Sequence, residues 1–173
     1  MAYRIMEYLF GQQIGITFLT KGHIPSPHMD LLKNNAEMVS AQFGLISLDE
    51  KLSKVFEPNT ATPNVRLMQA KQLKDCGISC QARLDPILLG LTDDENTINK
   101  ICENLSGIGI RNTAVSALFL RPAIIHSLKK NLKDQEMAEL ILNRYCDKRR
   151  FSIHADKSTV IALPIEERRI IYN

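Results

Sequence analysis

One stretch constrains the fold more than any other, residues 77–95 with the sequence GISCQARLDPILLGLTDDE. Apolar and polar residues alternate over 78–84, which is typical of a β-strand. Asp85-Pro86 is expected to end this strand, because proline lacks an N–H and restricts the residue before it. The string TDDE at 92–95 is a capping-box pattern, which predicts a helix capped by Thr92. In α/β folds, ligands bind in the loop that follows such a strand.

The same alternation of strand and helix recurs along the first 122 residues. Near-continuous apolar strands joined by amphipathic helices predict right-handed βαβ crossovers and a parallel sheet. We therefore expect an α/β fold with four parallel strands. The predicted strands cover 14–20, 41–48, 78–84 and 111–120, and the predicted helices cover 3–12, 30–37, 64–75 and the residues after Thr92.

The pattern changes after Pro122, which suggests a second region. A helix is predicted over 134–147 and a short strand over 158–163. Pro164 is expected to start a last helix, with Glu166 and Glu167 favourable near its positive end. The predicted organisation is a partial barrel over 1–122 and a C-terminal α/β extension over 123–173.

The four cysteines do not have the spacing of a metal site. Cys76 is predicted to end a helix and Cys80 to lie within a strand, with no third ligand near in sequence. Cys102 is predicted to lie on the apolar face of its helix, with Ile98, Ile101 and Leu105, and to act as a small hydrophobic residue. We expect no metal site from these residues.

Composition and charge exclude few classes of function. The chain has 173 residues, 45% of them hydrophobic and 24% charged, as in ordinary soluble domains. No apolar run has membrane-spanning length and no signal peptide opens the chain, so we expect no membrane partner and a cytoplasmic location. Residues 121–173 carry eleven Lys or Arg against seven Asp or Glu, a net of +4. A basic region can follow phosphates, but it is more often only a solvated face.

Five strings occur in an order that resembles one known family: TKG at 20–22, ISLDEKLSKVFEPNTATPNVRL at 46–67, DPILLGLTDDE at 85–95, LFLRP at 118–122 and LPIEERRIIY at 163–172. Together they resemble radical S-adenosylmethionine (radical SAM) proteins of the spore photoproduct lyase-like group, often labelled DNA repair photolyases. The resemblance covers nearly the whole chain. It implies strands 3–6 of a partial (β/α)6 barrel, related to the TIM barrel, that binds S-adenosylmethionine and a [4Fe–4S] cluster and begins chemistry with a 5′-deoxyadenosyl radical.

This chain departs from the family at the cluster. The family carries a CxxxCxxC motif after its first strand, and no such motif occurs here. Three thiolates hold such a cluster and leave one iron for the cofactor. We therefore expect the chain to be a truncated or split form that needs an N-terminal half for the cluster. The alternatives are a cofactor-binding or protein-interaction module without catalysis, and an inactive remnant.

The resemblance also implies site residues, although each has a structural alternative. Lys21 and Ser47 are expected to contact the amino-acid end of the cofactor; otherwise they are ordinary strand-end residues. Arg66 is expected either to pair with Glu57 and brace the loop, which we favour, or to turn to the cofactor carboxylate. The adenine is expected to bind the backbone and apolar side chains of the loop formed by Asp85, Pro86 and Ile87. No catalytic residue is identified, and the substrate is not indicated.

Partners follow from the same arguments. An N-terminal half is expected to pair beside the first predicted strand, IGITFLT. Without it, that strand would be an unpaired edge, which favours self-association. Nucleic acid is suggested by analogy with the lyase and by the weakly basic C-terminal region.

Overall fold

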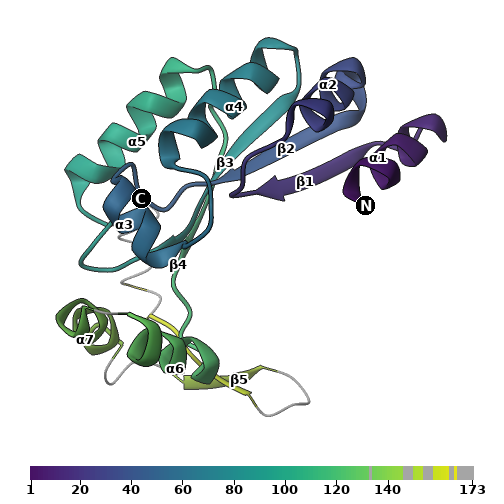
Figure 1. Ribbon diagram of the computed structural model, residues 1–173. Helices are drawn as coiled ribbons and strands as arrows, with labels where there is room; N and C mark the ends of the chain where they lie inside the picture. The colour runs from purple at the N-terminus through teal and green to yellow at the C-terminus, as the bar shows by residue number, and fades with distance from the viewer. Residues whose placement is uncertain (133, 146–149, 154–157, 164–165, 167–173) are drawn as a thin grey trace. The chain divides into compact units, whose positions relative to one another are not determined.

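A computed structural model describes residues 1–132, 134–145, 150–153, 158–163 and 166 (Figure 1). Its helices and strands are, in order, α1 Ala2–Gly11, β1 Ile16–Thr20, α2 Ser26–Asn34, the 3-10 helix η1 Ala36–Met38, β2 Val39–Gly44, α3 Glu50–Phe56, α4 Pro63–Asp75, β3 Ser79–Ile87, α5 Glu95–Gly107, β4 Thr113–Ala117, α6 Pro122–Asn131, α7 Gln135–Asn143, β5 Arg150–Ile153 and β6 Ser158–Ile161.

Strands β1 to β4 form one sheet in the order β1-β2-β3-β4. The pairs β1–β2 and β2–β3 are parallel, with Ile16 opposite Val39 and Ser40 opposite Ser79. Helices α2, α4 and α5 lie along one face of this sheet (Figure 1). The predicted α/β fold with a four-stranded parallel sheet is therefore confirmed.

Contacts divide the chain into two compact units. The first contains residues 1–84 and 99–114, and the second contains 85–98 and 115–173. The expected boundary at residue 122 stays a prediction. In the second unit, β5 and β6 form a separate antiparallel pair, and Leu120 forms a bridge with Ile161.

The core of the first unit lies between the sheet and its helices. On β2, Val39, Ala41 and Phe43 are at most 4% exposed, whereas the alternate residues Ser40 and Gln42 are half-buried on the other face. This two-residue alternation is the ordinary geometry of a strand covered by helices on one side.

The structure corrects several predicted boundaries. Strand β2 ends at Gly44, so Ser47 lies in the following loop. Strand β3 does not end before Asp85-Pro86 but continues through this cis peptide bond to Ile87. Helix α2 begins at Ser26 rather than residue 30, because Pro27 is accommodated in its first turn, where no N–H is required.

Other local predictions were wrong or missing. Thr92 does not cap α5; Asp94 does, by accepting a hydrogen bond from the Thr97 N–H. Cys102 is exposed rather than on the buried face of α5. Helices α3 and α6 and strand β5 were not predicted. The helix predicted from Pro164 lies outside the described residues apart from Glu166.

None of the helices in the described part of the chain has the length and apolar character that crossing a bilayer requires.

Candidate functional site

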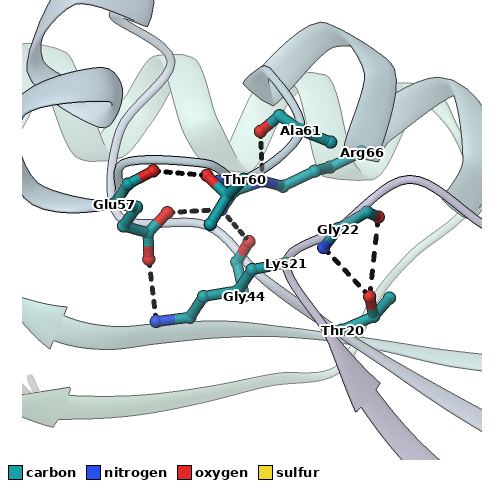
Figure 2. A network of polar contacts seen from close by, with 8 residues as sticks. All are labelled: Thr20, Lys21, Gly22, Gly44, Glu57, Thr60, Ala61 and Arg66. Carbon is teal, nitrogen blue, oxygen red and sulfur yellow. Dashed lines mark hydrogen bonds and ion pairs between the residues drawn. The ribbon is translucent and has the colours of Figure 1, made fainter.

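A network of polar side chains lies where β1 and β2 end in the first unit (Figure 2). Lys21 directly follows β1, and Gly44 is the last residue of the neighbouring strand β2. The Nζ atom of Lys21 lies 2.7 Å from Oε1 of Glu57, which follows α3. Because β1 and β2 are parallel, their carboxyl ends meet at one edge of the sheet, and we call this edge the rim.

Arg66 of α4 holds the other oxygen of Glu57. Its Nη1 atom donates to Glu57 Oε2 at 2.5 Å and to the carbonyl oxygen of Gly44 at 2.8 Å. The Arg66 and Glu57 side chains are 1% and 7% exposed, so the ion pair is buried. The predicted Glu57–Arg66 pair is present in the structure.

The same guanidinium braces the loop over residues 57–62. Its Nε atom donates to the Ala61 carbonyl at 2.8 Å and Nη2 donates to Thr60 Oγ1 at 2.5 Å. Thr60 Oγ1 donates to the Glu57 carbonyl at 2.7 Å. The Ala61 N–H donates to the Lys21 carbonyl at 2.9 Å, which closes a ring back to β1. The loop therefore holds both the backbone and the side chain of Lys21.

Gln69 holds the residues that follow Lys21. Its Oε1 accepts from the Ile24 N–H at 2.6 Å, and its Nε2 donates to the Gly22 carbonyl at 3.2 Å. Sequence reasoning missed both this clamp and the Lys21–Glu57 contact. A signal was present, because Arg66, Gln69, Ala70 and Leu73 have helical spacing and form the buried face of α4. Two polar residues in such a stripe indicate partners in the core.

Ser47 has a local partner. It is 4% exposed, and its Oγ accepts from the Asp49 N–H at 3.0 Å. Asp49 in turn caps α3 by accepting from the N–H groups of Lys51 and Leu52. No hydrogen bond or ion pair joins Ser47 to Lys21 or Arg66 within the described residues. The structure therefore brings Lys21 and Arg66 together around Glu57 but does not link Ser47 to them.

Asp85, Pro86 and Ile87 belong to the second unit. Ile87 is 4% exposed, and its carbonyl accepts from the Leu118 N–H at 3.2 Å. The proposed convergence of these residues with Lys21 on one ligand stays a prediction, as does cofactor binding by any of the six residues.

The three cysteines in the described part of the chain, Cys76, Cys80 and Cys102, do not suit an iron–sulfur cluster. Burial raises the pKa of the Cys80 thiol to about 11, which disfavours the thiolate that a metal needs. Cys76 follows the end of α4, whereas Cys102 lies within α5, and both are exposed. Among the described residues, no three His, Cys, Asp or Glu side chains are grouped so that they could hold a metal ion. These three cysteines are therefore poor candidates for cluster ligands.

Apart from the rim, a hollow lies on the sheet face that the helices leave open. Its volume is about 600 Å³, and polar residues at the beginnings of the strands line it, among them Thr17, Ser40, Gln42, Ser79 and Gln81. Gln42 and Gln81 are joined by a hydrogen bond of 3.1 Å. This groove lies at the amino ends of the strands, away from the rim.

Comparison with known proteins gives distant sequence relatives. No protein-family model matches the chain. An uncharacterized protein of Mycobacterium tuberculosis and one of Mycobacterium bovis are each 27% identical over 108 residues, which is 61% of this chain and 32% of the relative. The chain thus spans about a third of the length of the curated relatives that it matches.

Solved structures match a larger part of this chain than the sequence relatives do, and they match it in fold. Spore photoproduct lyase has a TM-score of 0.66 at 14% identity, over 99% of this chain and 49% of the lyase. The lyase solved with bound AdoMet and dinucleoside spore photoproduct has a TM-score of 0.65 at 13% identity, with the same coverage. SuiB of Streptococcus suis, solved with bound S-adenosylmethionine, has a TM-score of 0.51 at 15% identity, over 65% of this chain and 25% of SuiB. At these identities the likeness concerns the fold, and the chain therefore has the fold of part of spore photoproduct lyase, as its sequence resemblance to the radical SAM group predicted.

Proposed function

We propose that this chain is part of a radical SAM protein of the spore photoproduct lyase-like group, and that its rim binds the amino-acid end of S-adenosylmethionine. The observation that carries the proposal is the ammonium of Lys21, which Glu57 holds at the carboxyl edge of the sheet while the lysine side chain is still 35% exposed. An ammonium in this position is suited to a charge-assisted hydrogen bond with a carboxylate. The fold likeness to two proteins solved with this cofactor supports the assignment.

The residues of the rim fit one end of the cofactor. Lys21 would pair with its carboxylate, and Ser47 would contribute a hydroxyl from the loop after β2. The backbone around Asp85, Pro86 and Ile87 would receive the adenine. Arg66 would act indirectly, because its guanidinium already donates to four protein acceptors. This division gives Lys21 the direct contact and Arg66 the bracing role.

The proposal assigns the [4Fe–4S] cluster to residues outside this chain. Cluster and cofactor together supply the radical chemistry of the group, and the cysteines described above do not suit a cluster. We therefore propose that an N-terminal half, on the same or a separate polypeptide, supplies the CxxxCxxC motif. The lengths of the relatives support this, since the chain covers 49% of the lyase. The cytoplasm is the proposed compartment.

The edge of β1 is the proposed site for that half. β1 is the first strand in the sheet order and pairs with β2. Leu19 on β1, Ile14 before it and Ile5 on α1 are each at least 50% exposed. We expect the purified chain to self-associate through this edge, and sedimentation that shows a monomer at high concentration would count against the assignment.

A module that binds the cofactor without catalysis is the second candidate. The intact rim network, together with the lack of a metal-binding group among the described residues, favours it over an inactive remnant. Anaerobic reconstitution separates the candidates, using iron and sulfide assays on the chain alone and on the chain with its N-terminal half. We expect a stoichiometric cluster only in the second sample. A cluster on this chain alone, lost on replacing Cys76 and Cys80, would contradict the proposal.

Cofactor binding is tested by nuclear magnetic resonance of the backbone amides during titration with S-adenosylmethionine to millimolar concentration. We expect shifts in residues 20–22 and 44–49, weakened in Lys21→Ala and Ser47→Ala. Lys71→Ala is the control, because this exposed lysine also forms an ion pair, at 2.6 Å from Asp75. Shifts that are absent from the rim, or that neither rim substitution weakens, would contradict the proposal.

A nucleic-acid lesion is the proposed class of substrate, by analogy with the dinucleoside spore photoproduct bound to the lyase. The net charge of +4 over residues 121–173 agrees with a phosphate-bearing ligand. Binding of single-stranded DNA by the chain, with an affinity that falls steeply as the salt concentration rises, would support this. A lack of binding at low salt would contradict it.

A further inference from the structure

The stem of Lys21 crosses the end of β2 at the one place where that strand has no side chain. A Cβ atom added to Gly44 would lie 2.6 Å from Cε, 2.8 Å from Cγ and 3.2 Å from Cδ of Lys21. A Cβ atom does not come this close to a side chain of another residue unless one of the two moves. The path of the lysine therefore depends on glycine at position 44.

The glycine is not required by the backbone. Gly44 lies in β2 and is not among the residues with a positive φ. The three atoms nearest to an added Cβ all belong to the flexible side chain of Lys21. Alanine at this position would therefore displace the lysine and leave the strand in place.

Glu57 defines where the lysine path ends. Its carboxylate lies 2.7 Å from Nζ, but the contact is an ion pair without hydrogen-bond alignment, since Oε1 has no hydrogen-bond partner among the described residues. The ammonium also donates no hydrogen bond to any described residue. Lys21 is thus held by its ion pair with Glu57, and an ammonium with three N–H donors can still donate to a ligand.

The charges of this group favour a ligand with a single negative charge. Lys21 and Arg66 bring two positive charges to the one carboxylate of Glu57, which leaves a net charge of +1. Arg66 is 1% exposed and Glu57 is 7% exposed, so Lys21, at 35%, is the member that a ligand can reach. One carboxylate group of a ligand would complete the group with neutral charge.

From this geometry we infer that Gly44 and Glu57 are positioning residues, which fix the Lys21 ammonium for recognition of a ligand carboxylate. The inference rests on the proposed function, in which that carboxylate belongs to S-adenosylmethionine. Gly44 provides the open path, Glu57 holds the ammonium at its end, and Arg66 anchors both by donating to Glu57 Oε2 and to the Gly44 carbonyl.

Gly44→Ala tests the inference more cleanly than removal of Glu57. Glu57→Gln frees the lysine, which weakens binding, but it also adds net positive charge, which strengthens the attraction for anions. Gly44→Ala moves the lysine without changing any charge. Gly107→Ala is the matched control, because a Cβ at Gly107 would meet no atom within 4 Å.

Two ligands separate carboxylate recognition from adenosine recognition. S-adenosylhomocysteine carries the amino-acid end, and methylthioadenosine lacks it. The full chain and its Gly44→Ala, Lys21→Ala and doubly substituted variants are titrated with both. We expect Gly44→Ala to reduce the preference for S-adenosylhomocysteine by about tenfold, as for the loss of one charge-assisted hydrogen bond. The affinity for methylthioadenosine should stay unchanged, and Gly44→Ala should have no further effect when Lys21 is alanine.

The results distinguish failure of the inference from failure of the proposed function. An unchanged preference in Gly44→Ala, or an equal loss of both ligands, would overturn the inference alone. If neither ligand binds the original chain, the proposed function fails and the inference fails with it.

The side-chain resonance of the Lys21 Cε–Nζ group gives a measurement without ligand. We expect it to shift in Gly44→Ala and Glu57→Gln but not in Gly107→Ala, and no shift in Gly44→Ala would also overturn the inference.

Discussion

The loop after β1 and the loop after β3 are held in different ways. The first, residues 21–25, is fixed by residues distant in sequence, since Glu57, Ala61 and Gln69 contact it from the region of α3 and α4. The second, residues 88–94, is fixed within itself. Thr92 Oγ1 accepts from the Leu88 N–H at 2.9 Å, and Asp93 Oδ1 accepts from the Gly90 N–H at 2.7 Å.

This difference concerns both stability and function. A loop held by its own hydrogen bonds needs only its local sequence, whereas the loop that carries Lys21 depends on a buried network from another part of the chain. Removing a partner from that network leaves buried charge or polar groups unsatisfied, which costs more than losing an exposed contact. Four substitutions test the comparison, in order of decreasing effect.

The largest effect is expected for Arg66→Met. This change leaves the Glu57 carboxylate without its buried partner and removes every bond that the guanidinium makes to the loop over 57–62. We expect a loss of about 3 kcal/mol in the free energy of unfolding, measured by urea denaturation. Lys71→Met is the control, because its ion pair with Asp75 is more than half exposed and should contribute less than about 0.5 kcal/mol. Similar losses in the two variants would refute the comparison.

Gln69→Leu should have the next largest effect. It removes the acceptor of the Ile24 N–H and the donor to the Gly22 carbonyl, with Ile24 9% exposed. We expect a loss of about 2 kcal/mol and faster hydrogen exchange at the Ile24 amide. Gln72→Leu, at an exposed position of the same helix, should change neither quantity. An Ile24 amide that exchanges at its original rate would show that the clamp is unimportant.

Thr92→Val should have a smaller effect, in the locally held loop. Valine has nearly the same shape but leaves the buried Leu88 N–H without its acceptor. We expect a loss of about 1 kcal/mol. Thr92→Ser keeps the hydroxyl and should retain the hydrogen bond, as judged by exchange at the Leu88 amide. A loss as large as that of Arg66→Met would remove the contrast between the two loops.

The smallest effect is expected for Asp94→Asn, and it should be present near neutral pH and disappear in acid. The pKa of Asp94 is lowered by hydrogen bonds from the side chain and backbone N–H of Thr97. The folded chain therefore favours the charged form, so its contribution to stability is present above the ordinary pKa and lost as the pH falls through the lowered value. We expect the unfolding midpoint of the original chain to fall more steeply with acid than that of Asp94→Asn. Parallel curves would contradict this.

Local patterns predicted the framework well. The alternation over 78–84 and the helical spacing over 64–75 correspond to β3 and α4. Where a pattern admitted two interpretations, the local one failed. Thr92 was a plausible cap for α5, but its hydroxyl accepts from Leu88 and Asp94 caps the helix instead. Cys102 has helical spacing with Ile101 and Leu105, yet it is exposed, whereas those two residues are buried.

The candidate site was predicted in part. The Glu57–Arg66 pair was expected from two charged residues flanking one loop, and the structure contains it. The contact of Lys21 with Glu57 was not expected, because 36 positions separate the two residues and no spacing rule joins them. The clamp by Gln69 was missed for the same reason, although its place on the buried face of α4 indicated a polar partner.

The sequence by itself determined the alternation of four strands with helices, the parallel α/β fold and the lack of a three-cysteine motif. These properties depend on side-chain periodicity, turn chemistry and composition, which act over a few residues or are counted directly. Only the tertiary structure decided that the stem of Lys21 passes over Gly44 to Glu57 and that Arg66 joins both. The pairing of β1 with β2 brings Lys21 beside Gly44, and the packing of α4 brings Arg66 to the same point. Such contacts arise from how the helices and strands pack. The local sequence around each residue does not indicate which distant residues will lie near it.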